Sequence, residues 1–296
     1  MSYPIAWLRT GWRQGIFCQA VQPTRVTGRT SSLCVLFALL VISLPVSANI
    51  GAVESLAIDV AQKSGMVDMI ASYPEQISAH IHQNTSAKRS PMDQSRAIDM
   101  LLKAYNSLDT NDLLVRYIQE HVSPQALHAI NDWFESDLGT RFSAAEKAVS
   151  TVQGQLGERD YLAGLKKHGP TAERVRLIRQ FESAAALRDI NMDMIALMMK
   201  SEMAAMNRLL PAEKRKTDTE LSAQLEKELG DIPPVMSAML KQQMLDISEY
   251  TYRDFTDDEL TDYILFLESD AGKVLVGLYR QAPEFVFDKV IEKMER

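Results

Sequence analysis

The sequence predicts an all-helical protein, made of two duplicated helical units that follow an N-terminal signal peptide. The first observation is a motif that occurs twice, at residues 122–139 and 255–272, with Glu-Ser-Asp-x-Gly ending both copies. The second is that apolar residues recur at helical spacing along the chain, without the alternation that is typical of strands. The third is a basic start followed by a short apolar run and a small-residue site.

Residues 1–48 have the features of a secretory signal peptide. They hold four arginines and no acidic residue, followed by the apolar run 33–44 and by Val46-Ser47-Ala48. A bilayer span needs roughly 20 apolar residues, so this run is too short for an anchor. We expect cleavage after Ala48 and a periplasmic or secreted chain with no stable membrane anchor. A conventional signal length would begin near Val26, so starts at Met1 and near Val26 both stay open.

The composition is that of a globular protein, with 46% apolar and 24% charged residues. Both cysteines, Cys18 and Cys34, lie in the predicted signal peptide. The mature chain would therefore lack disulfides, thiolate metal sites and a cysteine nucleophile. Without the four arginines, 28 basic residues face 39 acidic ones, a net charge of −11. This balance argues against nucleic acid and against anionic lipid as partners.

The two copies of the motif define two predicted units, 49–168 and 169–296. The boundary is placed at Gly169-Pro170, the strongest helix-breaking pair in the middle of the chain. Units of this size lie in the usual domain range, so each could bury a core of its own.

The first unit is expected to be a series of capped helices. Ser90-Pro91 and Ser123-Pro124 each combine an N-cap with proline at the first helical position, and Thr110 is predicted as a further cap. Gly154 and Gly157 are expected to loosen the end of the helix that follows Ser136. The expected helices cover 52–63, 66–82, 91–106, 110–121, 124–135 and the segment from 137 to about 152.

The second unit is expected to repeat this plan. Thr171 restarts the helical pattern, and Thr217 with Glu220 satisfies the capping-box rule. Pro283 is predicted to begin the last helix. The expected helices cover 171–187, the methionine-rich stretch 192–206, 218–229, 234–252, 257–268, the segment after Ser269, and 283–294.

Within each motif copy we expect structural roles. Thr256 and Glu259 form a predicted capping box, whereas the first copy has Ala126 at the acidic position. A glycine in the first turn of the second helix allows close approach of the helix before it. The residues assigned to this structural motif are Ser123, Trp133, Glu135, Ser136, Gly139, Thr256, Glu259, Phe266, Glu268, Ser269 and Gly272.

The repeated pattern [ST]-x-x-x-L-x-x-x-x-x-[WF]-[FL]-E-S-x-x-G resembles a family of exported bacterial proteins catalogued as domain of unknown function 2059. The resemblance covers about 20 residues of each unit, so it implies two tandem copies. It implies an all-helical periplasmic or secreted domain, and it brings no assigned activity and no catalytic residues.

Candidate catalytic and metal sites are few. Ser136 or Ser269 as a nucleophile would need a base and oxyanion donors, and no histidine accompanies the second copy. We therefore interpret both serines as helix caps. His80 and His82 are two residues apart on a helix and point about 200° apart, so they cannot share one ion. Phosphate loops, dinucleotide fingerprints and zinc-protease helices are absent from the sequence. We expect no cofactor and no enzymatic activity.

The function expected from these features is binding. The main hypothesis is an interaction or chaperone-like module, because the methionine-rich helix could line an adaptable groove for an envelope protein or a small ligand. The alternative is Cu(I) or other metal handling through thioethers, with Met199, Met203 and Met206 as candidate ligands. Successive turns of one helix separate these thioethers by about 5 to 6 Å, so a second helix would have to contribute. The residues that could do so are Met236, Met239 and Met244.

Overall fold

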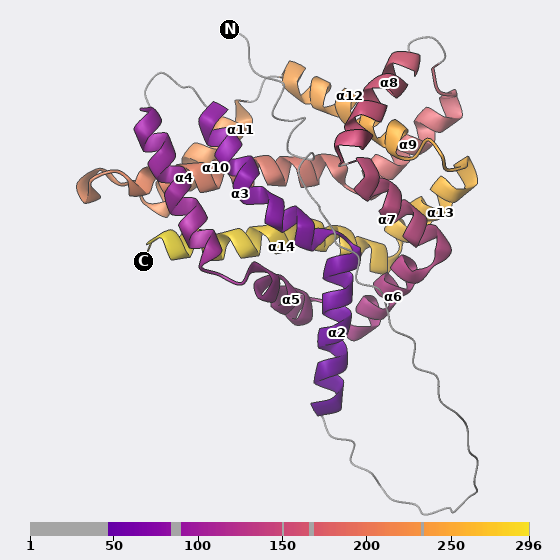
Figure 1. The fold of residues 1–296 in the computed structure, drawn as a ribbon, viewed down its shortest axis with the longest axis horizontal. Helices are drawn as coiled ribbons and strands as arrows, with labels where there is room; N and C mark the ends of the chain where they lie inside the picture. The colour runs from indigo at the N-terminus through magenta and orange to yellow at the C-terminus, as the bar shows by residue number, and fades with distance from the viewer. Residues whose placement is uncertain (1–46, 84–89, 150, 166–168, 232–233, 296) are drawn as a thin grey trace, which may run out of the picture.

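The computed structural model describes residues 47–83, 90–149, 151–165, 169–231 and 234–295, and the helix labels begin at α2 (Figure 1). This part of the chain contains thirteen α-helices, one 3-10 turn and no strand, so the all-α prediction is confirmed. The first helices are α2 (Ser47–Lys63), α3 (Met66–Gln83), α4 (Pro91–Asn106), α5 (Thr110–His121), α6 (Pro124–Glu135), α7 (Asp137–Val149) and α8 (Val152–Leu165). They are followed by α9 (Ala172–Ala184), α10 (Leu187–Arg208), η1 (Ala212–Lys214), α11 (Asp218–Gly230), α12 (Pro234–Thr251), α13 (Asp257–Glu268) and α14 (Asp270–Glu295).

The predicted signal peptide lies outside the described residues, except that α2 already begins at Ser47. Among the described helices, none combines the length and the apolar character that crossing a bilayer requires.

Most of the predicted N-caps are present. Ser123 Oγ accepts a hydrogen bond from the Ala126 amide at 3.2 Å, and Thr171 Oγ1 accepts one from the Arg174 amide at 3.1 Å. The prediction that Thr110 is a cap is wrong: the cap of α5 is Asp109, whose Oδ1 accepts from the Asp112 amide at 2.9 Å. A carboxylate one residue earlier reaches the free amide, so the helix begins at Thr110 instead of after it.

Two helix ends differ from the prediction. Gly154 and Gly157 do not loosen the end of α7; both lie inside α8, because α7 ends at Val149 and α8 begins at Val152. Pro283 does not begin a helix but lies within the 26-residue helix α14. Proline weakens a helix interior by removing one hydrogen bond. Here Leu278 before it and Phe287 after it are both buried in the same core, so packing carries the helix through.

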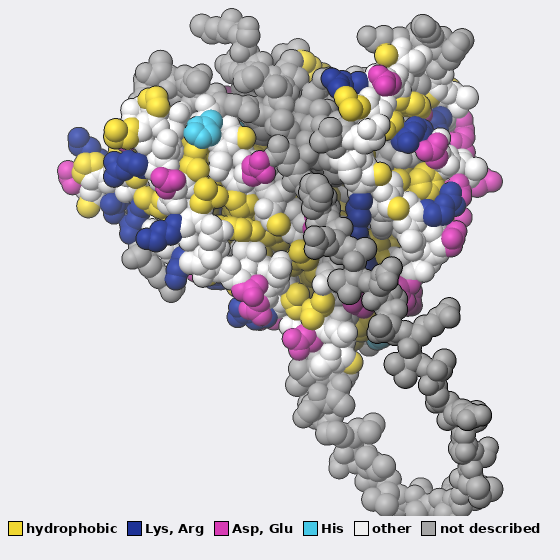
Figure 2. Space-filling view, viewed as in Figure 1, with side chains coloured by type: hydrophobic (Ala, Val, Ile, Leu, Met, Phe, Trp, Pro, Cys, Tyr) yellow, Lys and Arg dark blue, Asp and Glu magenta, His cyan; other side chains and the backbone are white. Residues whose placement is uncertain are grey.

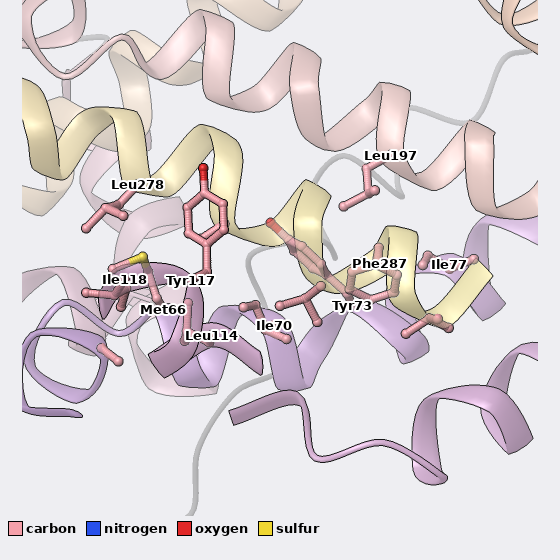
Figure 3. Close-up of a cluster of buried hydrophobic side chains, with 14 of the residues drawn as sticks. Met66, Ile70, Tyr73, Ile77, Leu114, Tyr117, Ile118, Leu197, Leu278 and Phe287 are labelled. Atoms are coloured by element: carbon pink, nitrogen blue, oxygen red, sulfur yellow. The ribbon is translucent and has the colours of Figure 1, made fainter. Parts of the chain in front are cut away.

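The helices form two hydrophobic cores. The first core is built by α2 to α6 together with α10 and α14, and Figure 3 shows side chains from several of these helices meeting there. The second core is built by α7, α9, α13 and the segment between α12 and α13. Each core therefore takes helices from both predicted units.

The helices that follow the two motif copies pack in opposite cores. Phe142 of α7 lies six residues after Ser136 and is 1% exposed in the second core. Leu275 of α14 lies six residues after Ser269 and is 2% exposed in the first core. Helix α7 therefore packs with the helices of the second core. Helix α14 lies across the helices of the first core, beside α4, α5 and α10. This reciprocal exchange joins the two halves into one packed body.

Candidate functional site: a groove between α10, α11 and α14

The two motif serines make the same pair of hydrogen bonds. Ser136 Oγ donates to the Trp133 carbonyl at 2.6 Å and accepts from the Gly139 amide at 3.0 Å. Ser269 Oγ donates to the Phe266 carbonyl at 2.6 Å and accepts from the Gly272 amide at 3.1 Å. Each hydroxyl joins the last turn of one helix to the first turn of the next, which is the work of a cap.

The motif glycines lie where the two helices of each corner meet. A Cβ on Gly139 would stand 2.0 Å from the Trp133 carbonyl oxygen, and a Cβ on Gly272 would stand 2.0 Å from that of Phe266. No side chain fits at such a distance from backbone atoms, so the sharp corner requires glycine.

The acidic residues of the motif serve different purposes. Glu135 accepts from Lys63 Nζ at 2.6 Å, and this hydrogen bond is the main cause that lowers the pKa of the Glu135 carboxyl. Glu259 completes the capping box with Thr256, and the hydrogen bond from Arg141 lowers the pKa of Glu259 to about 2. Glu268 is exposed.

Two charged residues that sequence analysis did not single out are central to the second core. The Glu146 carboxylate accepts hydrogen bonds from the Tyr252 hydroxyl at 2.8 Å and the Tyr263 hydroxyl at 2.9 Å. Burial raises the pKa of Glu146, and these two hydrogen bonds oppose the rise. Arg174 donates to the Phe255 carbonyl at 3.1 Å and thereby holds the turn before α13. The sequence feature that could have identified Glu146 is its place on the same face of α7 as Phe142, where a charged residue is unexpected.

His80 and His82 lie in different surroundings. His80 pairs with Glu202 of α10, with 3.0 Å between Nε2 and Oε2, while His82 is exposed. Within the described ranges, no group of three His, Cys, Asp or Glu side chains is close enough to hold an ion.

The three candidate methionine ligands of α10 share one face of the helix, because steps of four and three residues return to nearly the same side. Met199 and Met206 pack against the first core, and Met203, which is 7% exposed, lines a groove beside it. Helix α12 packs chiefly against α7, α8 and α9; on it, Met239 is exposed, and the side chain of Met236 lies outside the described part.

The groove that Met203 lines lies between α10, α11 and α14 and has a volume of about 840 Å³. Its size falls within the range of about 300 to 1,000 Å³ that is typical of small-molecule sites. Its apolar lining comes from all three helices and includes Met194, Leu197, Met203, Leu221, Leu225, Ile291 and Met294.

Salt bridges hold the groove's base together. Arg280 of α14 pairs with Asp193 of α10 at 2.6 Å, and Lys200 of α10 pairs with Asp288 of α14 at 2.6 Å. The pair that comes first on α10 also comes first on α14. The two helices therefore run parallel, as Figure 1 shows.

One end of the groove is basic. Arg208, Arg215 and Lys216 line it there, at the loop between α10 and α11. In Figure 2, Lys and Arg side chains gather at the end of the molecule where Figure 1 places this loop. The loop is held in place by the Asn207 side chain, which accepts from the Lys216 amide at 2.8 Å and donates to the Lys216 carbonyl at 2.9 Å. The Arg215 guanidinium also donates to the Leu210 carbonyl at 3.0 Å and to the Arg208 carbonyl at 3.2 Å.

Comparison with known proteins gives one match. Residues 110–158 match a family described as an uncharacterized protein conserved in bacteria (DUF2059). This segment contains the first copy of the motif, so the resemblance is supported there, while the match does not extend to the second copy. Neither the curated proteins nor the solved structures provide a match.

Proposed function

We propose that this chain is an exported, non-enzymatic binding protein whose groove between α10, α11 and α14 receives the apolar part of a ligand. The observation that carries the proposal is the groove itself: a volume of about 840 Å³, in which apolar side chains from three helices lie among charged ones. Concave sites that combine apolar side chains with placed polar groups are the usual form of a ligand pocket.

Helix α11 supports the proposal because its apolar side is incompletely covered. The helix has no fully buried residue, and its Leu221 and Leu225 are half-buried where they line the groove. A ligand that covers this surface would remove apolar area from water, a gain of about 25 cal/mol per Å².

The methionines support an adaptable site. Met194 and Met203 line the groove, and an unbranched thioether adjusts to ligands of different shape. The same property would suit a chaperone-like role towards apolar segments of envelope proteins. Metal handling has less support, because α12, which carries Met236, Met239 and Met244, packs chiefly against α7, α8 and α9.

A non-enzymatic role is supported by the motif serines. The hydroxyl groups of Ser136 and Ser269 already bond to backbone groups on both sides of a helix corner. A serine nucleophile needs a base and a set of oxyanion donors, and these bonds supply neither.

We also propose that the chain consists of two tandem copies of the family's domain behind a signal peptide. Support comes from joints that recur in both halves in the same order. Gly65 with a φ of 77° precedes α3, and Ala186 with a φ of 48° precedes α10. Ser136 and Ser269 form the second pair of matching joints, with ψ angles of 155° and 166°. Export rests on residues 1–48 and on the family resemblance.

Binding of an uncharged, environment-sensitive dye such as N-phenyl-1-naphthylamine tests the groove. We expect the purified protein to enhance its fluorescence, and Leu225→Glu to reduce the affinity at least ten-fold, because a carboxylate would stand in the apolar lining. Leu265→Glu is the matched control: Leu265 is 59% exposed on α13, so this variant should bind the dye like the parent. Dye binding that is absent, or that Leu225→Glu leaves unchanged, would refute the proposed site.

A further inference from the structure

The basic end of the groove narrows the class of ligand, on the premise that the groove is the binding site proposed above. Arg208, Arg215 and Lys216 line this end, where Asp218 is the acidic lining residue on the adjoining first turn of α11. Elsewhere along the groove, the two lining bases pair with carboxylates: Arg280 with Asp193, and Lys200 with Asp288. Three further carboxylates, Glu226, Glu284 and Glu292, line this part. The positive charges outside these pairs therefore lie at one end of the groove.

The basic end is rigid as well as charged. The two hydrogen bonds between the Asn207 side chain and the Lys216 backbone fix the loop over the end of α10. Arg215 is fixed by its bonds to two carbonyls of the same turn. Charges held in place lose little freedom when an anion binds, so they favour binding more than mobile surface charges do.

The apolar part of the groove has the length of one lipid chain. On α10 it extends from Met194 to Met203, which at 1.5 Å per residue is about 14 Å. One leaflet of a bilayer is about 15 Å thick in its hydrocarbon region, half of the roughly 30 Å core. An apolar floor of this length with a positive end is complementary to a chain with an anionic head.

We propose that the ligand of this groove is a single-chain anionic amphiphile, with its acyl chain against α10, α11 and α14 and its head group at Arg208 and Lys216. The net charge of −7 for the whole chain repels anions at long range, so a preference for an anionic head must come from this local cluster. The head group can be a carboxylate, as in a free fatty acid, or a phosphate diester, as in a lysophospholipid.

Displacement of the bound dye tests the head group. The probes are palmitate, lysophosphatidylglycerol and the uncharged monopalmitoylglycerol, each below the concentration at which it forms micelles. We expect at least one anionic probe to bind about ten-fold more tightly than the uncharged one. Palmitate and lysophosphatidylglycerol separate the carboxylate from the phosphate source.

The charge variants place the head group. The double variant Arg208→Gln, Lys216→Gln should weaken the anionic probe about three- to ten-fold, because a charge that is at least partly exposed contributes modestly. The uncharged probe should bind the double variant like the parent. The control Lys147→Gln, Lys273→Gln removes two exposed charges from α7 and from the first turn of α14 and should leave both affinities unchanged.

The outcomes are distinguishable. Equal affinity for charged and uncharged probes overturns the head-group inference and leaves the groove intact. Displacement by an acidic amphipathic peptide but not by any of the three amphiphiles also overturns it and assigns the groove to a protein segment. Failure of the dye itself to bind would instead remove the proposed function on which the inference rests.

Discussion

Trp133 of α6 and Phe266 of α13 stack face to face, with ring centroids 4.3 Å apart and ring planes 6° apart. The two residues occupy the same position in the repeated motif, 133 residues apart. The helix after Trp133, α7, packs in the second core, and the helix after Phe266, α14, packs in the first. The stacked pair therefore marks the crossing point of the helix exchange, and it supports the proposal that the halves are copies of one unit.

A double-mutant cycle measures the stacking. Trp133→Leu and Phe266→Leu should each destabilise the protein, and the double variant should cost less than the sum of the two by about 0.5 to 1.5 kcal/mol. Chemical denaturation supplies the free energies of unfolding. The control cycle combines Trp133→Leu with Phe285→Leu on α14, and the effects of these two substitutions should be additive. A coupling energy of the same size in the control cycle would remove the evidence for a specific contact between Trp133 and Phe266.

Alanine at the motif glycines should be destabilising. Helix propensity alone favours Ala over Gly by up to about 1 kcal/mol. At Gly139 and Gly272 the new Cβ would meet backbone carbonyls, so we expect a net loss of about 1 to 3 kcal/mol. Gly277→Ala in α14 is the matched control, because a Cβ there meets nothing within 4 Å and should stabilise. A gain in unfolding free energy for Gly272→Ala would show that the corner is not crowded.

Removing the cap of α13 should cost about 1 kcal/mol. Thr256 Oγ1 accepts from the Glu259 amide at 3.2 Å, and Thr256→Ala leaves this amide without its partner. Thr256→Ser keeps the hydroxyl and should retain most of the stability. Equal thermal midpoints for the Ala and Ser variants would mean that the hydroxyl contributes nothing.

The pH dependence of stability should have a contribution from Glu182. Burial raises the pKa of this half-buried carboxyl from 4.5 to about 7, so the folded state retains a proton that the unfolded state releases. Its contribution is therefore full below about pH 4.5 and is lost as the pH rises to about 7.

Glu182→Gln should consequently be more stable than the parent above pH 7 and equal to it below pH 4.5. Screening by solvent limits the difference to about 1 kcal/mol. Denaturation at pH 4 and pH 8 measures it, and Glu228→Gln, at an exposed site of α11, serves as control. A difference that grows towards low pH would contradict the assignment.

Neither half should fold alone as a monomer. The first core contains Leu275, Leu278 and Phe287 of α14, so fragment 49–168 would expose the apolar side chains that these residues cover. Circular dichroism and sedimentation should show loss of cooperative unfolding or self-association for such a fragment. A monomeric, cooperatively folding fragment 49–168 would instead mean that the exchanged helices are dispensable.

Much of the helix plan is determined by interactions between near neighbours, and these can be read from the sequence. The caps at Ser123 and Thr256 and the serine corners depend on groups at most a few residues apart, so a short stretch of sequence contains all their partners. Each serine corner depends on one hydroxyl and one glycine. Both residues belong to the repeated motif, so the motif sequence predicts the geometry of the corner.

Long-range packing decided the rest. Pro283 lies within a helix because the buried residues on both sides of it enter one core, and its own neighbours do not reveal that core. Three other features also join residues that are far apart along the chain. They are the exchange of α7 and α14, the hydrogen bonds of Glu146 with two tyrosines, and the groove between α10 and α11. Helical spacing of apolar residues predicts which face of a helix is buried. The same spacing fits any partner helix that could cover that face, so only the tertiary structure shows which partner does.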